Sequence, residues 1–438
     1  MVSQNVEEQF EVWSNMYRLN DAAYQSFKAD GESLGMLGST VATRNYAGRL
    51  IEAMQGKNPI VWFNLTFNPE ILYAMDIVPI CIQILGALYG FTQQIGKVVD
   101  LIDYAESIGV PSDLCSVDKM STAIMMRKLL PRPACHIGIN APCDSQVFSA
   151  QSMIELEPAP QFFIDVPYYK DERSIKYVAG QIKELIPFLS RHTGRKFDID
   201  KLREACELSN RMVENMWEWM EWRKHIPVVQ PSKLCQMGLY LTLLSSGCED
   251  GLIWSEGLKR EAKEKALRNE TVINERVRAI WYQDAIAWDL MLYDWMEKVL
   301  GLTIPMDLFG YFARDRIIDT STLDSMLYGL ARKNVILEPM SRQFMYNFEF
   351  FVQDLMIMVE EFQADCAIYA GHLGCKHGWA ATGLLREACR KADIPLLVFE
   401  FDMFDHRVMG QEELKSKLTQ FVEDIVWPRK QSRQMAGV

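Results

Sequence analysis

The chain has 438 residues, of which 49% are hydrophobic and 24% charged, and its formal net charge is -12. A chain of that length is longer than a typical single domain, so it predicts two or three domains, and the composition is that of an ordinary globular protein. The acidic balance is spread along the chain and argues against nucleic acid or an anionic membrane as a partner, because neither tolerates repulsion without a basic patch.

The amino terminus, residues 1–10, is polar and acidic, which predicts that no secretory signal is present. The most apolar window, residues 77–91, contains Pro79 and is shorter than the roughly 20 residues that a membrane helix needs, so we predict it to be core. Ten cysteines without a signal predict a reducing, cytoplasmic location, with free thiols or metal ligands rather than disulfides.

Apolar periodicity predicts an amphipathic helical lead-in at residues 1–44, followed by an N-terminal α/β lobe at 45–195. Apolar runs predict the strands of that lobe, at 59–63, 78–84, 134–139 and 161–166. A helical segment follows at 196–270. It includes a tryptophan-rich run, Trp217, Trp219 and Trp222, which fits a packed helix face or a protein interface.

Residues 271–430 are predicted to form a C-terminal α/β lobe, followed by a tail at 431–438. Its predicted strands are 278–282, 302–306, 367–371 and 395–401, and its predicted helices are 287–299, 341–362, 379–391 and 412–426. Alternating strands and helices indicate mostly parallel sheets. We therefore predict an α/β protein with two flavodoxin-like (Rossmann-like) lobes flanking a cleft, plus the helical lead-in and a helical middle layer.

Cys375 lies in a glycine-flanked turn between a predicted strand and a predicted helix. This placement predicts that its side chain lies in the crevice at the carboxyl end of a strand, where open α/β sheets hold ligands. Cys81 and Cys115 are expected at strand ends or in the turns that follow, so two facing lobes could bring all three together. Three thiolates suit an iron–sulfur cluster with one iron free to take a substrate oxygen. Core filling is the alternative, since free cysteine is often buried.

Cys143 also falls between a predicted strand and a predicted helix, which makes it the alternate ligand. A helix cap by Asp144 or Ser145 explains that segment equally well. The four cysteines that lie within helical patterns are predicted to fill the core, and these are Cys206, Cys235, Cys248 and Cys389.

His372 and His377 flank Cys375 and are the candidate proton carriers or hydrogen-bond donors, with capping of a turn as the alternative for either. Cys375 and His377 also form a C-x-H pair that zinc could use, but no second pair lies nearby. Asp402 and Asp405 follow a predicted strand and could face the cleft, although pairing of Asp405 with Arg407 or a helix cap is the simpler interpretation.

No G-x-G-x-x-G and no P-loop motif occurs, so we expect this chain to bind no nucleotide and any ATP chemistry to come from a partner. Several short motifs occur in a characteristic order. Those of the first half are Asn68-Pro69-Glu70-Ile71-Leu72 with Ile77-Val78-Pro79, then Leu114-Cys115-Ser116, then Pro142-Cys143-Asp144-Ser145. Those of the second half are Gly374-Cys375-Lys376, then Ile394-Pro395 leading to Glu400-Phe401-Asp402 and Asp405-His406-Arg407. In this order and spacing, over about residues 45–428, the chain resembles the 2-hydroxyacyl-CoA dehydratase and benzoyl-CoA reductase family, as a catalytic D-component type subunit.

The resemblance implies that Cys81, Cys115 and Cys375, with Cys143 as substitute, hold a [4Fe-4S] cluster in an oxygen-sensitive heterodimer. It also implies a homologous second subunit and an ATP-dependent iron–sulfur activator that injects one electron. The implied reaction removes water from an (R)-2-hydroxyacyl-CoA and gives an enoyl-CoA through a ketyl radical. Residues 62–67, before the Pro-Glu motif, hold no cysteine, which disfavours a double-cubane cluster.

Three alternatives stay open. Within the family, the resemblance also allows a subunit of a benzoyl-CoA reductase-type, dearomatising enzyme, in which the electron enters an aromatic ring and is consumed. A clusterless scaffold subunit would complete an interface, and the tryptophan-rich run favours that function. A stand-alone electron carrier would bind iron but no thioester.

Overall fold

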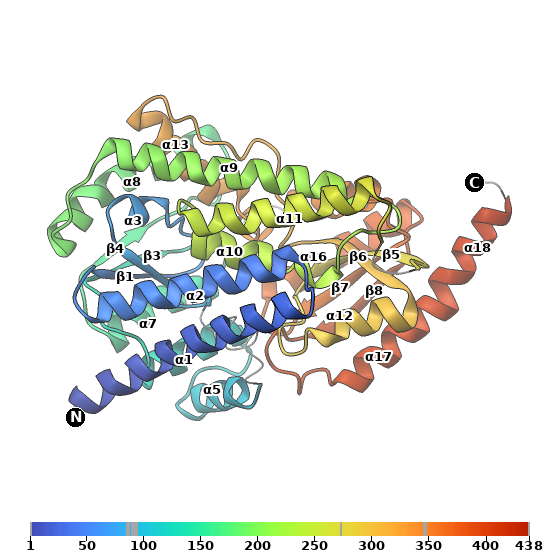
Figure 1. Cartoon of the computed structure of the whole chain (residues 1–438), viewed down its shortest axis with the longest axis horizontal. Helices are drawn as coiled ribbons and strands as arrows, with labels where there is room; N and C mark the ends of the chain where they lie inside the picture. Colours follow the sequence, from blue (N-terminus) through green and yellow to red (C-terminus); the bar gives the residue numbers. More distant parts are fainter. Residues whose placement is uncertain (1, 85–87, 89–94, 272–273, 345–347, 437–438) are drawn as a thin grey trace.

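Two four-stranded parallel sheets form the framework of the computed structural model, which describes residues 2–84, 88, 95–271, 274–344 and 348–436 (Figure 1). The first sheet has the order β2-β1-β3-β4 and contains β1 Ile60–Phe63, β2 Val78–Cys81, β3 Cys135–Ile139 and β4 Gln161–Ile164. The second has the order β6-β5-β7-β8 and contains β5 Val277–Gln283, β6 Leu302–Asp307, β7 Cys366–His372 and β8 Leu396–Phe401.

The two sheets therefore repeat one topology, and the predicted fold class is confirmed. The inner strands β1, β3, β5 and β7 are buried along their whole length, as expected for parallel strands covered by helices on both faces. The edge strands β4 and β8 are partly exposed. The strand order reverses between β1 and β3 in the first sheet and between β5 and β7 in the second. Open α/β sheets bind ligands at such a point.

Long helices connect the two halves (Figure 1). Those of the amino-terminal and middle segments are α1 Val2–Ala29, α2 Leu34–Met54, α8 Glu172–Thr193, α9 Ile199–Arg223, the short 3-10 turn η1 Ser232–Leu234, α10 Met237–Ser245 and α11 Glu249–Leu267. Helix α2 packs between α1 and α11, and α11 packs on α9. Together they form the helical layer that spans both sheets.

The remaining helices belong to the two α/β halves. Those of the first half are α3 Glu70–Ala74, α5 Ile95–Ser107, α6 Ser116–Met126 and α7 Asp144–Leu156. Those of the second half are α12 Met291–Trp295 with the π-turn η2 Met296–Leu300, α13 Leu323–Arg332 with η3 Lys333–Leu337, α14 Ser341–Phe344, α15 Glu349–Glu361, α16 Lys376–Lys391, and α17 Gln411–Gln420 with η4 Phe421–Val426 and α18 Trp427–Ala436. Within the described ranges, no helix is both long enough and apolar enough to cross a bilayer.

Two predicted helices differ from the structure. The helix predicted at 287–299 begins only at Met291, because the Ala287 N–H donates to the Met403 carbonyl at 3.3 Å and so holds this segment against the loop after β8. The helix predicted at 341–362 is divided into α14 and α15, and Phe348, with φ of 57°, precedes the second. Part of the predicted core window, residues 85–87 and 89–91, lies outside the described residues.

The tryptophan-rich run of α9 is a packed helix face. Trp219 is fully buried, and the Trp217 indole donates to the carbonyls of Phe312 and Ala313 at 3.2 Å. Trp222 is partly buried against the core. This outcome removes the feature that favoured a scaffold subunit.

Most of the cysteines predicted as core are buried, namely Cys206, Cys235 and Cys389. Cys248 differs, because it is half-buried and precedes α11 instead of lying within a helix. The predicted pair of Asp405 with Arg407 is confirmed, at 2.7 Å.

Glu70, from the Pro-Glu motif, links the two halves of the chain through buried charges. Its carboxylate accepts from Lys333 in η3 and, at 2.8 Å, from the Ser209 hydroxyl of α9. A second buried pair, Arg316 with Glu338 at 2.5 Å, lies beside it. Because all four charged groups are almost completely buried, the two halves have little freedom to shift against each other.

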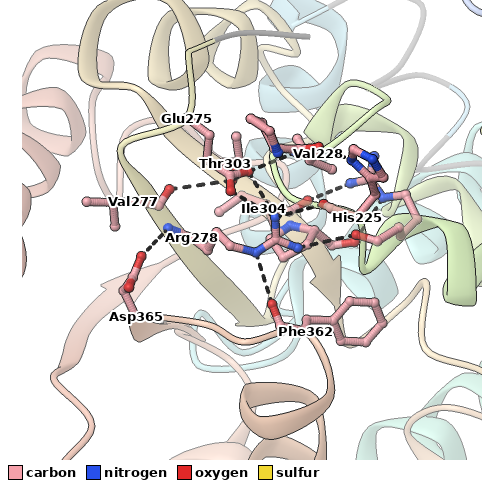
Figure 2. A network of polar contacts seen from close by, with 12 residues as sticks. His225, Val228, Glu275, Val277, Arg278, Thr303, Ile304, Phe362 and Asp365 are labelled. Atoms are coloured by element: carbon pink, nitrogen blue, oxygen red, sulfur yellow. Dashed lines mark hydrogen bonds and ion pairs between the residues drawn. The ribbon is translucent and has the colours of Figure 1, made fainter. Parts of the chain in front are cut away.

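Arg278 is the centre of a second buried network (Figure 2). Its guanidinium donates to the carbonyls of Phe362 and His225, at 2.9 and 3.1 Å, and pairs with Glu275 at 2.8 Å. Glu275 also accepts from the Thr303 hydroxyl of β6 at 2.7 Å. One arginine therefore links β5, β6, the end of α15 and the segment after α9.

We expect Arg278→Met to lower the free energy of unfolding by about 3–5 kcal/mol, because Glu275 is left as a buried charge without its partner. The double variant Arg278→Met/Glu275→Leu should lose less than the single one. Urea unfolding measures both. Arg390→Met provides the control, since Arg390 forms a pair of the same three-residue spacing on the surface and should change stability little. A double variant as unstable as the single one would contradict this account.

Candidate functional site

A cavity of about 350 Å³ lies where the carboxyl ends of the two sheets converge. Its wall includes residues that follow strands of both sheets, namely Leu65, Gln83, Cys143, Asp284 and Leu308. Its volume falls at the small end of the range of ligand pockets, and its position is the one that open α/β sheets use for binding.

Three cysteines, Cys115, Cys143 and Cys375, line this cavity, and each immediately precedes a helix. The helices are α6, α7 and α16 respectively. The Gly378 N–H of α16 donates to the Cys375 sulfur at 3.4 Å. Helix amino termini stabilise negative charge, so all three positions favour the thiolate form of a cysteine that binds a metal cation.

The backbones at Cys115 and Cys375 approach each other closely at Gly374. A Cβ atom at position 374 would lie only 2.6 Å from the Cys115 Cα and 2.7 Å from the Leu114 carbonyl carbon. Glycine is therefore required there for close approach of two loops that come from different halves of the fold.

His372, the last residue of β7, joins the cysteines to two carboxylates. Its Nε2 lies 3.2 Å from the Cys115 sulfur, and its Nδ1 lies 2.5 Å from an Asp284 oxygen and 3.6 Å from an Asp402 oxygen. The other Asp402 oxygen accepts from the Ser116 hydroxyl at 2.8 Å. This arrangement orients the imidazole with Nδ1 toward Asp284 and Nε2 toward Cys115.

The protonation of the site follows from burial and from these contacts. Burial lowers the pKa of His372, but the charges of Asp284, Cys115 and Asp402 outweigh burial and raise that pKa well above its usual range. Burial raises the pKa of Cys115 against the opposing effect of His372, and it raises the pKa of Cys375 to about 11. The metal-free cysteines are thus protonated at neutral pH, and binding of a metal centre must release protons.

Asp118 forms a second polar group in the wall. It accepts from the Gln83 amide at 2.9 Å and from the Ser145 hydroxyl, and it is fully buried. Burial raises the pKa of Asp118 to about 6, against the opposing effect of these hydrogen bonds. A carboxyl group that titrates near neutral pH inside a cavity is suited to carrying a proton.

Cys81 lies apart from the cysteines of the wall. It is the last residue of β2, it is 3% exposed, and it is not among the described residues that line the cavity. Its sulfur lies 3.8 Å from the Gln83 amide oxygen, and burial raises its pKa to about 12. His377 does line the cavity, and its ring lies 6.4 Å from that of Phe348.

Within the described residues, no group of three or more His, Cys, Asp or Glu side chains is arranged to hold a single metal ion. A four-iron cluster needs a different spacing of ligands, because each cysteine binds a different iron and the thiols therefore lie farther apart than around a single ion. Cys115, Cys143 and Cys375 line one cavity, and no fourth cysteine is among its described lining residues. This set has the number of thiols that a cluster with one iron lacking a protein ligand would need.

Several polar residues of this cavity were not identified from the sequence, among them Asp118, Gln236, Gln283 and Asp284. Gln283 and Asp284 end and follow β5, so the strand-end argument used for Cys375 could have found them. Asp118 lies in the first turn of α6, three residues after Cys115. Gln236 has no local signal, because it approaches the cavity from the helical layer.

The family model for the D-component of 2-hydroxyglutaryl-CoA dehydratase matches residues 64–425. Two relatives match shorter segments. The alpha subunit of (R)-phenyllactyl-CoA dehydratase from Clostridium sporogenes is 23% identical over 141 residues, which are 30% of this chain and 35% of that protein. The alpha subunit of (R)-2-hydroxyglutaryl-CoA dehydratase from Acidaminococcus fermentans is 26% identical over 102 residues, which are 22% of this chain and 21% of that protein. The matches thus span about a third and a fifth of these relatives.

Proposed function

Since this chain belongs to the 2-hydroxyglutaryl-CoA dehydratase D-component family, we propose that it is the cluster-bearing subunit of a dehydratase acting on a 2-hydroxyacyl-CoA. The observation that carries the proposal is that Cys115, Cys143 and Cys375 line one cavity. All three precede helices, and two of them come from one half of the fold and the third from the other. Residues of both halves therefore form the site.

Cys115, Cys143 and Cys375 would hold a [4Fe-4S] cluster in this cavity. When bound, such a cluster supplies one electron at low potential and an iron with an open coordination position, by which the 2-hydroxyl group of an acyl thioester can leave. His372 would orient Cys115 through its Nε2, while its Nδ1 pairs with Asp284.

Asp118 is the group of this chain that we propose for proton transfer at the acyl chain. It lies in the wall beside Ser145 and Gln83, and burial raises its pKa to about 6. A carboxylate with that pKa can take up a proton near neutral pH and return it to water or to the departing hydroxyl group. The largely apolar wall around it would exclude bulk water.

The relatives that match are alpha subunits, and their names support a second subunit as partner of this chain. We propose a homologous second subunit and an ATP-hydrolysing iron–sulfur activator that delivers the electron. Redox chemistry of this kind requires a donor, and this chain contains no P-loop motif.

The test is the content of iron and acid-labile sulfide after strictly anaerobic purification. We expect about four of each per wild-type chain, and near-complete loss in Cys375→Ser. Serine is a good helix cap, so α16 should persist and the loss would reflect the ligand. Cys248→Ser is the matched control, because Cys248 precedes α11 in the same manner but does not line the cavity. Negligible iron in a folded wild-type chain would overturn the proposal and restore the scaffold hypothesis.

ATP consumption separates dehydration from ring reduction once the chain is combined with a partner and an activator. Dehydration returns the electron at the end of each turnover, so ATP use should be much smaller than product formation. A constant ratio of ATP to product would identify a benzoyl-CoA reductase-type enzyme instead.

A further inference from the structure

Gln236 is a buried amide whose oxygen and nitrogen both lack a hydrogen-bond partner among the described residues. It is 2% exposed and lines the cavity. A glutamine in this state is costly, because water has been removed from both polar atoms without replacement. Such a group is explained by a ligand that supplies the missing partners.

The backbone beside Gln236 is tightly packed. Gln236 precedes α10, in which a Cβ at Gly238 would lie 2.3 Å from the Phe309 carbonyl oxygen. On the other side of this contact, a Cβ at Gly310 would lie 2.9 Å from the Cys235 carbonyl oxygen. The start of α10 is therefore packed, backbone against backbone, on the turn after β6.

Gln283 is a second amide in the wall. Its φ of 84° is one that residues other than glycine rarely adopt, it is 4% exposed, and its amide oxygen has no partner among the described residues. Its amide packs over Gly378, where a Cβ would lie 2.5 Å from the amide nitrogen. Backbone strain that the surroundings maintain is characteristic of functional positions.

The rest of the wall is mostly apolar, and the buried imidazole of His372 in it is already paired with Asp284 and Asp402. Leu239, Phe309 and Phe344 are among its apolar residues. It contains no arginine among the described residues, and the printed sequence has no lysine or arginine at 85–94 or 345–347. Lys376 is 73% exposed and pairs with Asp113 at 3.0 Å. An acyl chain that ends in a carboxylate would thus be buried without a counter-ion.

We propose that Gln236 and Gln283 bind the hydroxyl and carbonyl oxygens of a 2-hydroxyacyl thioester whose side chain is apolar and uncharged. This inference rests on the proposed function and adds the substrate class. The Gln236 amide, with donor and acceptor atoms both lacking partners, and the Gln283 amide oxygen, which lacks one, complement a hydroxyl group beside a carbonyl group. The apolar wall complements the side chain.

The test is equilibrium binding of two acyl thioesters to the full chain, purified with its partner subunit and without activator or ATP. The probes are phenyllactyl-CoA, with an apolar side chain, and 2-hydroxyglutaryl-CoA, with a carboxylate. We expect phenyllactyl-CoA to bind roughly 100-fold more tightly, because the side-chain carboxylate of 2-hydroxyglutaryl-CoA would be buried without a counter-ion. Equal affinities would overturn the substrate class and leave the dehydratase proposal standing. Absence of binding by either thioester would overturn both.

Gln236→Leu tests the amide itself. We expect phenyllactyl-CoA to bind roughly 10-fold more weakly, while Tm stays equal or rises, because the variant no longer buries an unpartnered amide. Gln420→Leu is the control, as Gln420 is an exposed glutamine of α17. Unchanged affinity in Gln236→Leu, or a Tm that falls by several degrees, would show that Gln236 has a structural role and would overturn its assignment.

Discussion

Replacing Cys143 with serine is expected to remove the iron–sulfur cluster that we propose, whereas replacing Cys81 with alanine is expected to leave the cluster in place. The physical reason is position. Cys143 lines the cavity with Cys115 and Cys375, and the charges of these two cysteines and of Asp118 contribute, after burial, to raising its pKa well above the usual range. Their mutual repulsion as thiolates is relieved when a cationic metal centre binds between them.

The measurement is iron and sulfide per chain together with the visible absorbance of the anaerobic protein. Cys143→Ser should fall from about four iron atoms to below about one, and its helix α7 should persist because serine caps helices well. Cys81→Ala should keep about four iron atoms and lose about 1 kcal/mol of stability, the cost of a small cavity in the core.

The opposite pattern is equally informative. Full iron in Cys143→Ser and none in Cys81→Ala would identify Cys81, Cys115 and Cys375 as the ligands, which is the set that the resemblance implied. Loss of iron in both variants, with both chains folded, would indicate that the region around β2 supports the cluster indirectly through Gln83, which contacts Cys81 and Asp118.

The fold class could be predicted because its signals are local. Apolar runs bounded by turns identified all eight described strands, and their alternation with helices indicated parallel sheets. The late start of α12 could not be predicted, since the hydrogen bond of Ala287 to Met403 joins residues far apart in sequence. Tertiary contacts override local helix preference at such positions.

The site was predictable to the extent that it follows strand ends. That argument led to Cys375, which follows β7, and to Cys115, but Cys115 lies between α5 and α6 and not in a turn after a strand. The structure nevertheless brings the two cysteines together at Gly374. Placement near a strand end does not distinguish a cysteine in the turn after a strand, as at Cys143, from one that ends the strand, as at Cys81. Cys81 is the last residue of β2, whereas Cys143 lies beyond the end of β3 and directly before α7, and only the tertiary structure shows which of the two lines the cavity.

Gln236 could not be identified as a site residue from any local sequence pattern. Its importance lies in the absence of a partner for both amide atoms, and that property depends on the whole wall of the cavity. Sequence shows which groups are polar, whereas folding decides which of them are buried and left for a ligand to satisfy.

Replacing Gly374 with alanine is expected to lower activity by at least about 100-fold while most of the chain stays folded. A Cβ there would meet backbone atoms of Cys115, at 2.6 Å from both its N and its Cα, so no side-chain rotation can relieve the contact. Either Cys115 or the turn that carries Cys375 must move. Both are proposed ligands, and the contact of Cys115 with His372 would change as well.

Gly383→Ala provides the matched control for this substitution. Gly383 lies in α16, nine residues farther along the chain, and a Cβ there would meet no atom within 4 Å. Because alanine favours helix, this variant should gain roughly 0.5–1 kcal/mol and keep its iron and its activity. Iron content, activity and Tm should be measured for both. If Gly374→Ala retained full iron and activity, the close approach of the two loops would not be what holds the cysteines in place, and the site would have to tolerate a shift that its packing argues against.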